Sequence, residues 1–93
     1  MKIVINTCFG GFGLSDIALA RYNELAGTNH TEYIYDGIER TDPFLVQVVE
    51  ELGELADDFS AELKIVDVPD DVKWYIHDYD GLEAVYEQHR IWD

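Results

Sequence analysis

Cysteine, basic residues and long apolar runs are all scarce in this chain of 93 residues. Cys8 is the only cysteine, so no intramolecular disulfide can form and a reducing compartment is expected. No uninterrupted apolar run approaches the roughly 20 residues that span a bilayer, and the opening Met1–Asn6 lacks the apolar core of a secretory signal. We therefore expect a cytoplasmic protein.

The shortage of basic residues leaves a strongly acidic chain. Six Lys and Arg stand against 20 Asp and Glu, for a formal net charge of −14. Residues 1–35 hold two basic and three acidic side chains, so −13 of that charge lies in residues 36–93. Such a field repels phosphate backbones and anionic membranes. We expect neither nucleic-acid nor membrane binding, and either a basic protein partner or simple solubility.

Apolar residues are plentiful, and they predict one folded domain over residues 1–93. Hydrophobic residues make up 47% of the sequence, more than a disordered chain carries. The first strand is expected at residues 2–7, where β-branched residues follow one another. A glycine-rich loop follows, and Ser15 then caps a helix over residues 16–26 that ends at Gly27.

The remaining elements complete a mixed pattern. Residues 32–35 predict a short strand, and Asp42-Pro43 opens a helix whose apolar spacing continues to Phe59. Residues 61–68 and 72–77 predict two strands that could pair as a hairpin. Asp80 and Glu83 resemble a capping box that opens a last helix. The order β-α-β-α-β-β-α predicts an α/β or α+β fold, with a single layer of about four strands and about three helices.

The glycine-rich loop is the first candidate site. Backbone N–H groups between a strand and a helix N-terminus can hold an anion, yet the spacing matches neither common phosphate motif. The alternative is that the glycines only permit a tight crossover. The candidate ligand-binding residues are Thr7, Cys8, Gly10, Gly11, Gly13 and Ser15.

Cys8 could be a nucleophile near a helix N-terminus or a small buried apolar residue. Small phosphotyrosine phosphatases place an arginine where this chain has Leu14, which excludes that pattern. His30, His77 and His89 are scattered and form no metal-binding spacing. We therefore expect no metal and no cofactor, and we assign no catalytic residue.

The acidic face of the second predicted helix is the other candidate site. A row of carboxylates can imitate phosphates and occupy a basic groove, although charge runs are often only solvated surface. The candidate partner-binding residues are Glu50, Glu51, Glu54, Asp57 and Asp58.

Two stretches carry a family resemblance: the opening VINTCFGGFGLS, and the ending VPDDVKW with YDGLE and EQHRIW. They resemble a family of short uncharacterised proteins of tailed bacteriophages and prophages. The resemblance implies no activity, but it implies the cytoplasm of an infected bacterium as the setting. It favours a binding protein that either inhibits a host defence protein through its acidic surface or sequesters a small nucleotide-like ligand at the glycine loop. The alternative is a small enzyme that uses Cys8 and the loop on a phosphate-containing or acyl substrate, assisted by Ser15, His77 or His89.

Overall fold

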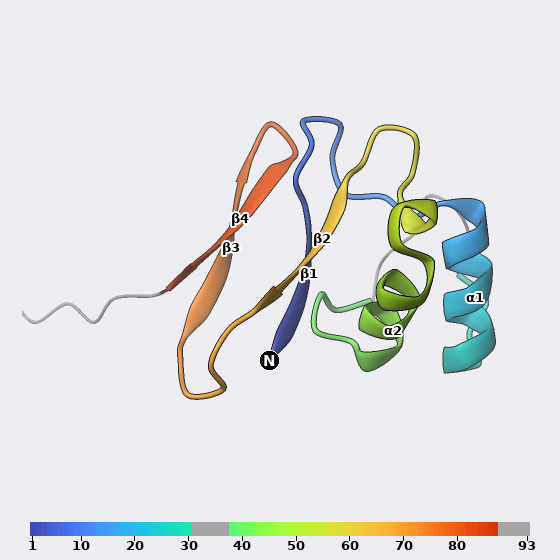
Figure 1. Cartoon of the computed structure of the whole chain (residues 1–93), viewed down its shortest axis with the longest axis horizontal. Helices are drawn as coiled ribbons and strands as arrows, with labels where there is room; N and C mark the ends of the chain where they lie inside the picture. Colours follow the sequence, from blue (N-terminus) through green and yellow to red (C-terminus); the bar gives the residue numbers. More distant parts are fainter. Residues whose placement is uncertain (31–37, 88–93) are drawn as a thin grey trace, which may run out of the picture.

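The computed structural model describes residues 1–30 and 38–87, and Figure 1 shows their arrangement. The described part of the chain contains two α-helices, one short 3₁₀ helix and four strands. In chain order they are β1 (Lys2–Asn6), α1 (Asp16–Ala26), α2 (Pro43–Leu52), η1 (Gly53–Ala56), β2 (Leu63–Asp67), β3 (Trp74–Tyr79) and β4 (Leu82–Glu87). The fold is therefore mixed α+β, which confirms the predicted class.

The helix α1 has the predicted bounds and caps. The Ser15 hydroxyl accepts a hydrogen bond from the Ala18 N–H at 3.1 Å, and Gly27 ends the helix in the left-handed conformation, at φ +69°. Its backbone N–H donates to the Asn23 carbonyl. The start and stop signals in the sequence therefore correspond to real hydrogen bonds.

The helix α2 starts where predicted but ends earlier. The Asp42 carboxylate accepts from the Phe44 N–H at 2.8 Å and Pro43 occupies the first turn. The predicted continuation to Phe59 is wrong, because Gly53 follows the last helical residue at φ +56°. The chain then tightens into η1.

The strands form two separate antiparallel pairs, so the predicted single four-stranded layer is wrong. β1 pairs with β2, with Lys2 opposite Asp67, and β3 pairs with β4. The suggested hairpin between residues 61–68 and 72–77 is also wrong, because those segments become β2 and β3 of different sheets. The strand predicted at residues 32–35 lies outside the described residues.

The predicted last helix is a strand. Asp80 and Gly81 have φ values of +53° and +89°, the left-handed conformation at both central residues of a two-residue hairpin turn. The chain reverses there and continues as β4. Asp80 is therefore part of a hairpin turn and does not cap a helix, which leaves two α-helices within residues 1–30 and 38–87 in place of the predicted three or so.

The core lies between the helices and the β1–β2 sheet. In Figure 1 the helices pack on one side of this sheet and the β3–β4 hairpin lies on the other side. β1 is almost completely buried after Lys2, as predicted for a covered strand. The central buried side chains are Val4, Leu14, Ala18, Leu19, Tyr22, Leu45, Val46, Val48, Val49 and Ala56. Among the described residues no helix has the length and apolarity that crossing a membrane requires.

Candidate functional site

Three loops meet at one end of the molecule. They are residues 8–13 after β1, residues 53–62 between α2 and β2, and residues 78–82 at the tip of the β3–β4 hairpin; we call this region the three-loop end. Figure 1 shows the three turns side by side at the top of the view. A methyl group added to Gly81 would lie 2.7 Å from the Gly11 nitrogen, and one added to Gly10 would lie 1.8 Å from the Ser60 carbonyl oxygen. The loops are therefore in direct backbone contact.

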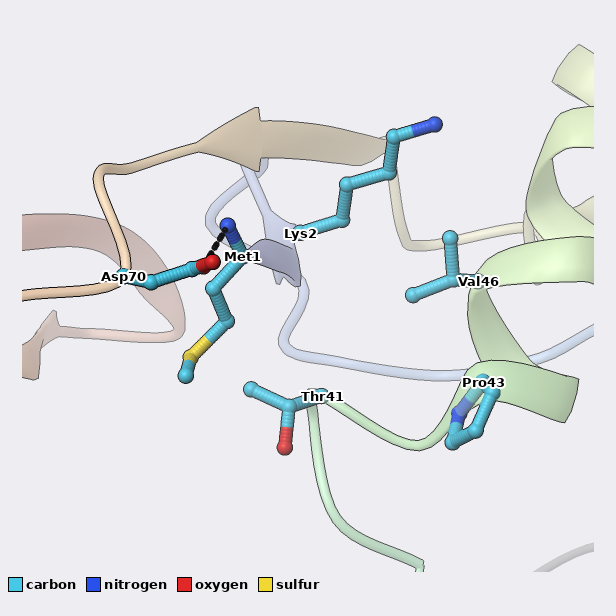
Figure 2. A pocket seen from close by; sticks show the side chains of 6 residues that line it. All are labelled: Met1, Lys2, Thr41, Pro43, Val46 and Asp70. Atoms are coloured by element: carbon cyan, nitrogen blue, oxygen red, sulfur yellow. Dashed lines mark hydrogen bonds and ion pairs between the residues drawn. The ribbon is translucent and has the colours of Figure 1, made fainter.

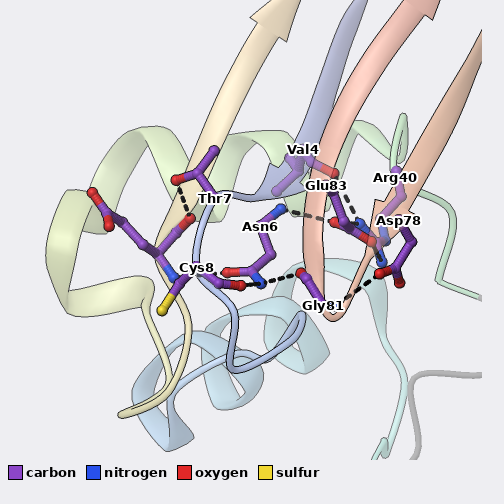
Figure 3. Close-up of polar contacts among 9 residues, drawn as sticks. Val4, Asn6, Thr7, Cys8, Arg40, Asp78, Gly81 and Glu83 are labelled. Atoms are coloured by element: carbon purple, nitrogen blue, oxygen red, sulfur yellow. Dashed lines mark hydrogen bonds and ion pairs between the residues drawn. The ribbon is translucent and has the colours of Figure 1, made fainter.

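The Asn6 side chain joins all three loops, and it is 0% exposed. Its amide nitrogen donates to the Cys8 carbonyl at 2.6 Å and to the Gly81 carbonyl at 2.7 Å, as Figure 3 shows. Its carbonyl oxygen accepts from the Glu62 N–H at 2.8 Å. An asparagine side chain offers two N–H donors and one carbonyl acceptor. Both donors and the acceptor of Asn6 therefore make hydrogen bonds to the loops.

A buried ion pair between Glu83 and Arg40 lies along the neighbouring edge of β1. The Glu83 carboxylate is 7% exposed and accepts from the Asn6 N–H at 2.8 Å. Arg40 binds it through both terminal nitrogens, and the Arg40 carbonyl accepts from the Val4 N–H at 2.9 Å. The Arg40 guanidinium also lies over the Phe12 ring, 3.7 Å from its centre. Because Glu83 belongs to β4, this network attaches the hairpin to the rest of the fold (Figure 3).

Two of the three glycines predicted to bind a ligand pack against protein atoms. Gly10 meets Ser60, and a methyl group on Gly13 would lie 2.9 Å from an Asp58 carboxylate oxygen. Gly11 has open space around it but a φ of +93°, which L-residues rarely adopt. Close approach and turn geometry therefore account for these glycines.

Ser15 and Thr7 of the predicted loop site also bond to protein groups. The Ser15 N–H donates to the Ala56 carbonyl at 2.9 Å, and its hydroxyl donates to the Leu55 carbonyl at 2.6 Å. The Thr7 hydroxyl donates to the Glu62 carbonyl at 2.9 Å. Ligand binding at this loop stays a prediction.

Cys8 is half-buried and lines a pocket of about 570 Å³. Three carboxylic acids share that pocket with it, namely Glu54, Asp57 and Glu62. The proposed helpers lie elsewhere or outside the described residues: Ser15 caps α1, His77 stacks on Tyr86 on the hairpin, and His89 is not described. Within residues 1–30 and 38–87, no group of His, Cys, Asp and Glu could hold a metal ion.

The predicted acidic face divides into two parts. Glu50 pairs with Lys2 at 3.3 Å, and Glu51 pairs with Arg21 at 3.0 Å. The hydrogen bond from Arg21 holds the pKa of the Glu51 carboxyl below its ordinary value. These two residues lie on α2 and have cations beside them. The other three, Glu54, Asp57 and Asp58, belong to the three-loop end.

The carboxylates of the three-loop end have no such neutralisation. None of its three segments contains a lysine or an arginine, and none of its carboxylates forms an ion pair within the described part of the chain. Backbone N–H groups hold three of them: Leu63 donates to Asp57, Phe59 to Asp58 and Gly81 to Asp78. The six carboxylates are Glu54, Asp57, Asp58, Glu62, Asp78 and Asp80.

A second pocket lies away from this end, beside the start of β1 and the N-terminus of α2. Its volume is about 390 Å³, and the residues that line it are Met1, Lys2, Thr41, Pro43, Val46 and Asp70. Figure 2 shows the Met1 amino group donating to Asp70 at its rim, over 2.7 Å. It contains none of the predicted site residues.

Several residues of the site were missed by sequence reasoning. Nothing in the sequence distinguishes Asn6, and Glu83 was interpreted as part of a capping box. The role of both residues depends on contacts between distant segments. The signal that could have indicated the hairpin tip was Asp80-Gly81, because this dipeptide between alternating residues is typical of a two-residue hairpin turn.

Comparison of the chain with protein-family models, with curated proteins and with solved structures gave no match.

Proposed function

We propose that the protein acts by binding, and that its three-loop end engages a basic surface on another protein. The observation that carries this proposal is the set of six carboxylates on three adjoining loops that contain no lysine or arginine. Fixed negative charge of this kind attracts a positive partner, raises the rate of encounter and disfavours anionic competitors.

The contacts within the three-loop end support a preformed surface. Asn6 bonds to all three loops, and backbone N–H groups orient three of the carboxylates. A partner would therefore meet groups that are already in place, which lowers the entropy lost on binding.

The resemblance to short tailed-phage proteins supplies the setting of the proposal. We place the protein in the cytoplasm of an infected bacterium, where it inhibits a host defence protein. Carboxylates spaced along adjoining loops can occupy a groove that otherwise receives nucleic-acid phosphates, because both present negative charge to the same Lys and Arg side chains.

Affinity capture from a bacterial lysate tests this proposal with two variants of equal charge. The first variant removes three of the six carboxylates of the three-loop end and carries Glu54→Gln, Asp58→Asn and Glu62→Gln. The control neutralises carboxylates of α1 and α2 and carries Glu24→Gln, Glu50→Gln and Glu51→Gln. The wild type and the control should capture the same basic protein, and the first variant should lose it.

Equal capture by both variants would contradict the proposal, because net charge alone would then explain binding. Loss in the control with retention in the first variant would move the binding surface to the helices. Amide spectra of both variants should match the wild-type spectrum, since solvent screens exposed ion pairs such as Arg21–Glu51 and they contribute little to stability.

The pocket beside Cys8 favours a second candidate function, a small enzyme with a thiol nucleophile. Its carboxylates would assist proton transfer, and the pocket of about 570 Å³ would receive the substrate. Iodoacetamide distinguishes the two functions, because an activated thiolate reacts rapidly near neutral pH. A binding protein should instead be alkylated at Cys8 more slowly when folded than when unfolded in urea.

A further inference from the structure

The three-loop end exposes large apolar side chains among its carboxylates. Phe59 is 98% exposed, and Leu55, Tyr79 and Phe9 are exposed to 66%, 65% and 63%. Each of the three loops contributes at least one of them. Single exposed apolar residues are common on protein surfaces, but several of them on adjoining loops mark interaction sites.

The segment that presents Phe59 is held by hydrogen bonds on both sides. The Ala61 N–H donates to the Asp58 carbonyl at 3.0 Å, and the Asp58 N–H donates to the Gly13 carbonyl at 3.4 Å. The Phe59 N–H donates to the Asp58 carboxylate at 2.8 Å. Phe59 is therefore the second residue of a turn over residues 58–61 that the Ala61–Asp58 hydrogen bond closes. Its backbone is fixed, although its ring contacts almost nothing.

The loop contacts place a second aromatic residue close to this turn. Gly10 packs against Ser60, so Phe9 and Phe59 each precede a residue of the same loop–loop contact. Leu55 is joined to the start of α1 through the hydrogen bond from Ser15 to its carbonyl. Phe9 and Phe59 thus flank one loop–loop contact, and the loop of Phe59 also carries Asp57, Asp58 and Glu62.

We infer that Phe59 is the apolar anchor of the binding surface and inserts into an apolar recess that lysine and arginine residues surround on the partner protein. This inference rests on the proposed function and adds the apolar half of the interface. Charge complementarity selects this partner, because the segments around Phe59 contain carboxylates and no basic residue. Protein interfaces commonly combine a buried aromatic centre with a polar rim.

Two synthetic lysine-rich peptides of equal length and charge test the anchor. One carries leucines along one helical face, and the other carries serines at the same positions. Their affinities are measured by calorimetry at physiological salt against the wild type, Phe59→Ser and the matched control Phe44→Ser. Phe44 is 40% exposed and lies on α2, outside the three-loop end.

The wild type should bind the leucine peptide more tightly than the serine peptide. Phe59→Ser should weaken binding of the leucine peptide by about 10–100-fold, the loss of affinity expected when a phenyl ring is no longer buried against the peptide. Binding of the serine peptide should stay unchanged. Phe44→Ser should change neither affinity. Because Phe59 makes so few contacts, its variant should keep the wild-type amide spectrum, which is recorded first.

Unchanged affinity of Phe59→Ser for the leucine peptide would overturn the anchor while leaving the proposed function in place. The variant that lacks three carboxylates of the three-loop end (Glu54→Gln, Asp58→Asn, Glu62→Gln) is measured in parallel. If it bound both peptides as tightly as the wild type, or if the wild type bound neither peptide, the proposed function itself would fail, and the anchor with it.

Discussion

Replacing Asn6 by aspartate should destabilise the protein strongly, although the two side chains have the same shape. The amide nitrogen of Asn6 donates to two carbonyl oxygens, at 2.6 Å and 2.7 Å. A carboxylate oxygen in that position would face both carbonyls without a proton. The site is fully buried, and the Glu83 carboxylate lies next to it on the Asn6 N–H.

The size of the effect follows from those contacts. Losing two hydrogen bonds costs about 1 kcal/mol each, and leaving buried polar groups unsatisfied costs about 1–3 kcal/mol more. We therefore expect Asn6→Asp to lower the free energy of unfolding by about 3–5 kcal/mol at pH 7. The free energy of unfolding of a domain is roughly 5–15 kcal/mol in total, so the variant should lose a large part of its stability.

Urea unfolding followed by circular dichroism measures this change against a charge-matched control. Asn29→Asp adds the same charge at an exposed position and should stay within about 0.5 kcal/mol of the wild type. Acid should partly rescue Asn6→Asp, because a protonated carboxyl can donate to one of the two carbonyls. Equal stability of the two variants at pH 7 would refute the assignment of Asn6 as the residue that joins the loops.

Three further predictions concern residues that shape the fold and the loops. Burial, and to a lesser extent the hydrogen bond to Asp42, raises the pKa of Tyr22 to about 12. The stability that the protonated Tyr22 hydroxyl contributes should be complete below about pH 10, the ordinary tyrosine pKa, and be lost as the pH rises to 12. Tyr22→Phe should remove this alkaline loss in unfolding curves recorded across that range. Gly10→Ala should cost about 2 kcal/mol or more, because its methyl group would overlap a backbone carbonyl, whereas Gly11→Ala should cost only about 1 kcal/mol of backbone strain in the same urea assay. Glu83→Gln should cost about 3 kcal/mol, since it leaves a largely buried guanidinium without its carboxylate; a change below 1 kcal/mol in the urea midpoint analysis would contradict that role.

The parts of the fold that local chemistry determines were predictable from the sequence. Ser15 and Gly27 bound α1 correctly, and Asp42-Pro43 gave the start of α2. Each signal acts through hydrogen bonds or backbone angles within a few residues. The end of α2 was missed because apolar spacing continues beyond Gly53, although the backbone angle at this glycine already ends the helix.

The arrangement of the strands was not predictable in the same way. β1 pairs with β2 across some sixty residues of chain, and nothing local distinguishes that partner from β3. Asp80 and Glu83 fit both a capping box and a hairpin turn, and the positive φ angles of Asp80 and Gly81 select the hairpin. The Glu83 carboxylate then points to β1 instead of to a helix terminus.

The candidate site was predicted in part. The glycine loop and the acidic segment were identified as two separate surfaces, and the structure places residues 8–13 beside residues 53–62 at one end. It also separates Glu50 and Glu51 from that end, because Lys2 and Arg21 pair with them. Tertiary contacts, among them those of Asn6 and the Gly10–Ser60 approach, decide which of these residues share a surface.

Hydrogen–deuterium exchange on the protein, alone and bound to the basic protein that it captures, tests the central claim most directly. Binding should slow exchange in residues 8–13, 53–62 and 78–82 together, and leave the exposed face of α2 around Glu50 unchanged. Protection confined to α2, or to the pocket beside Met1, would contradict the assignment of the three-loop end as the binding surface.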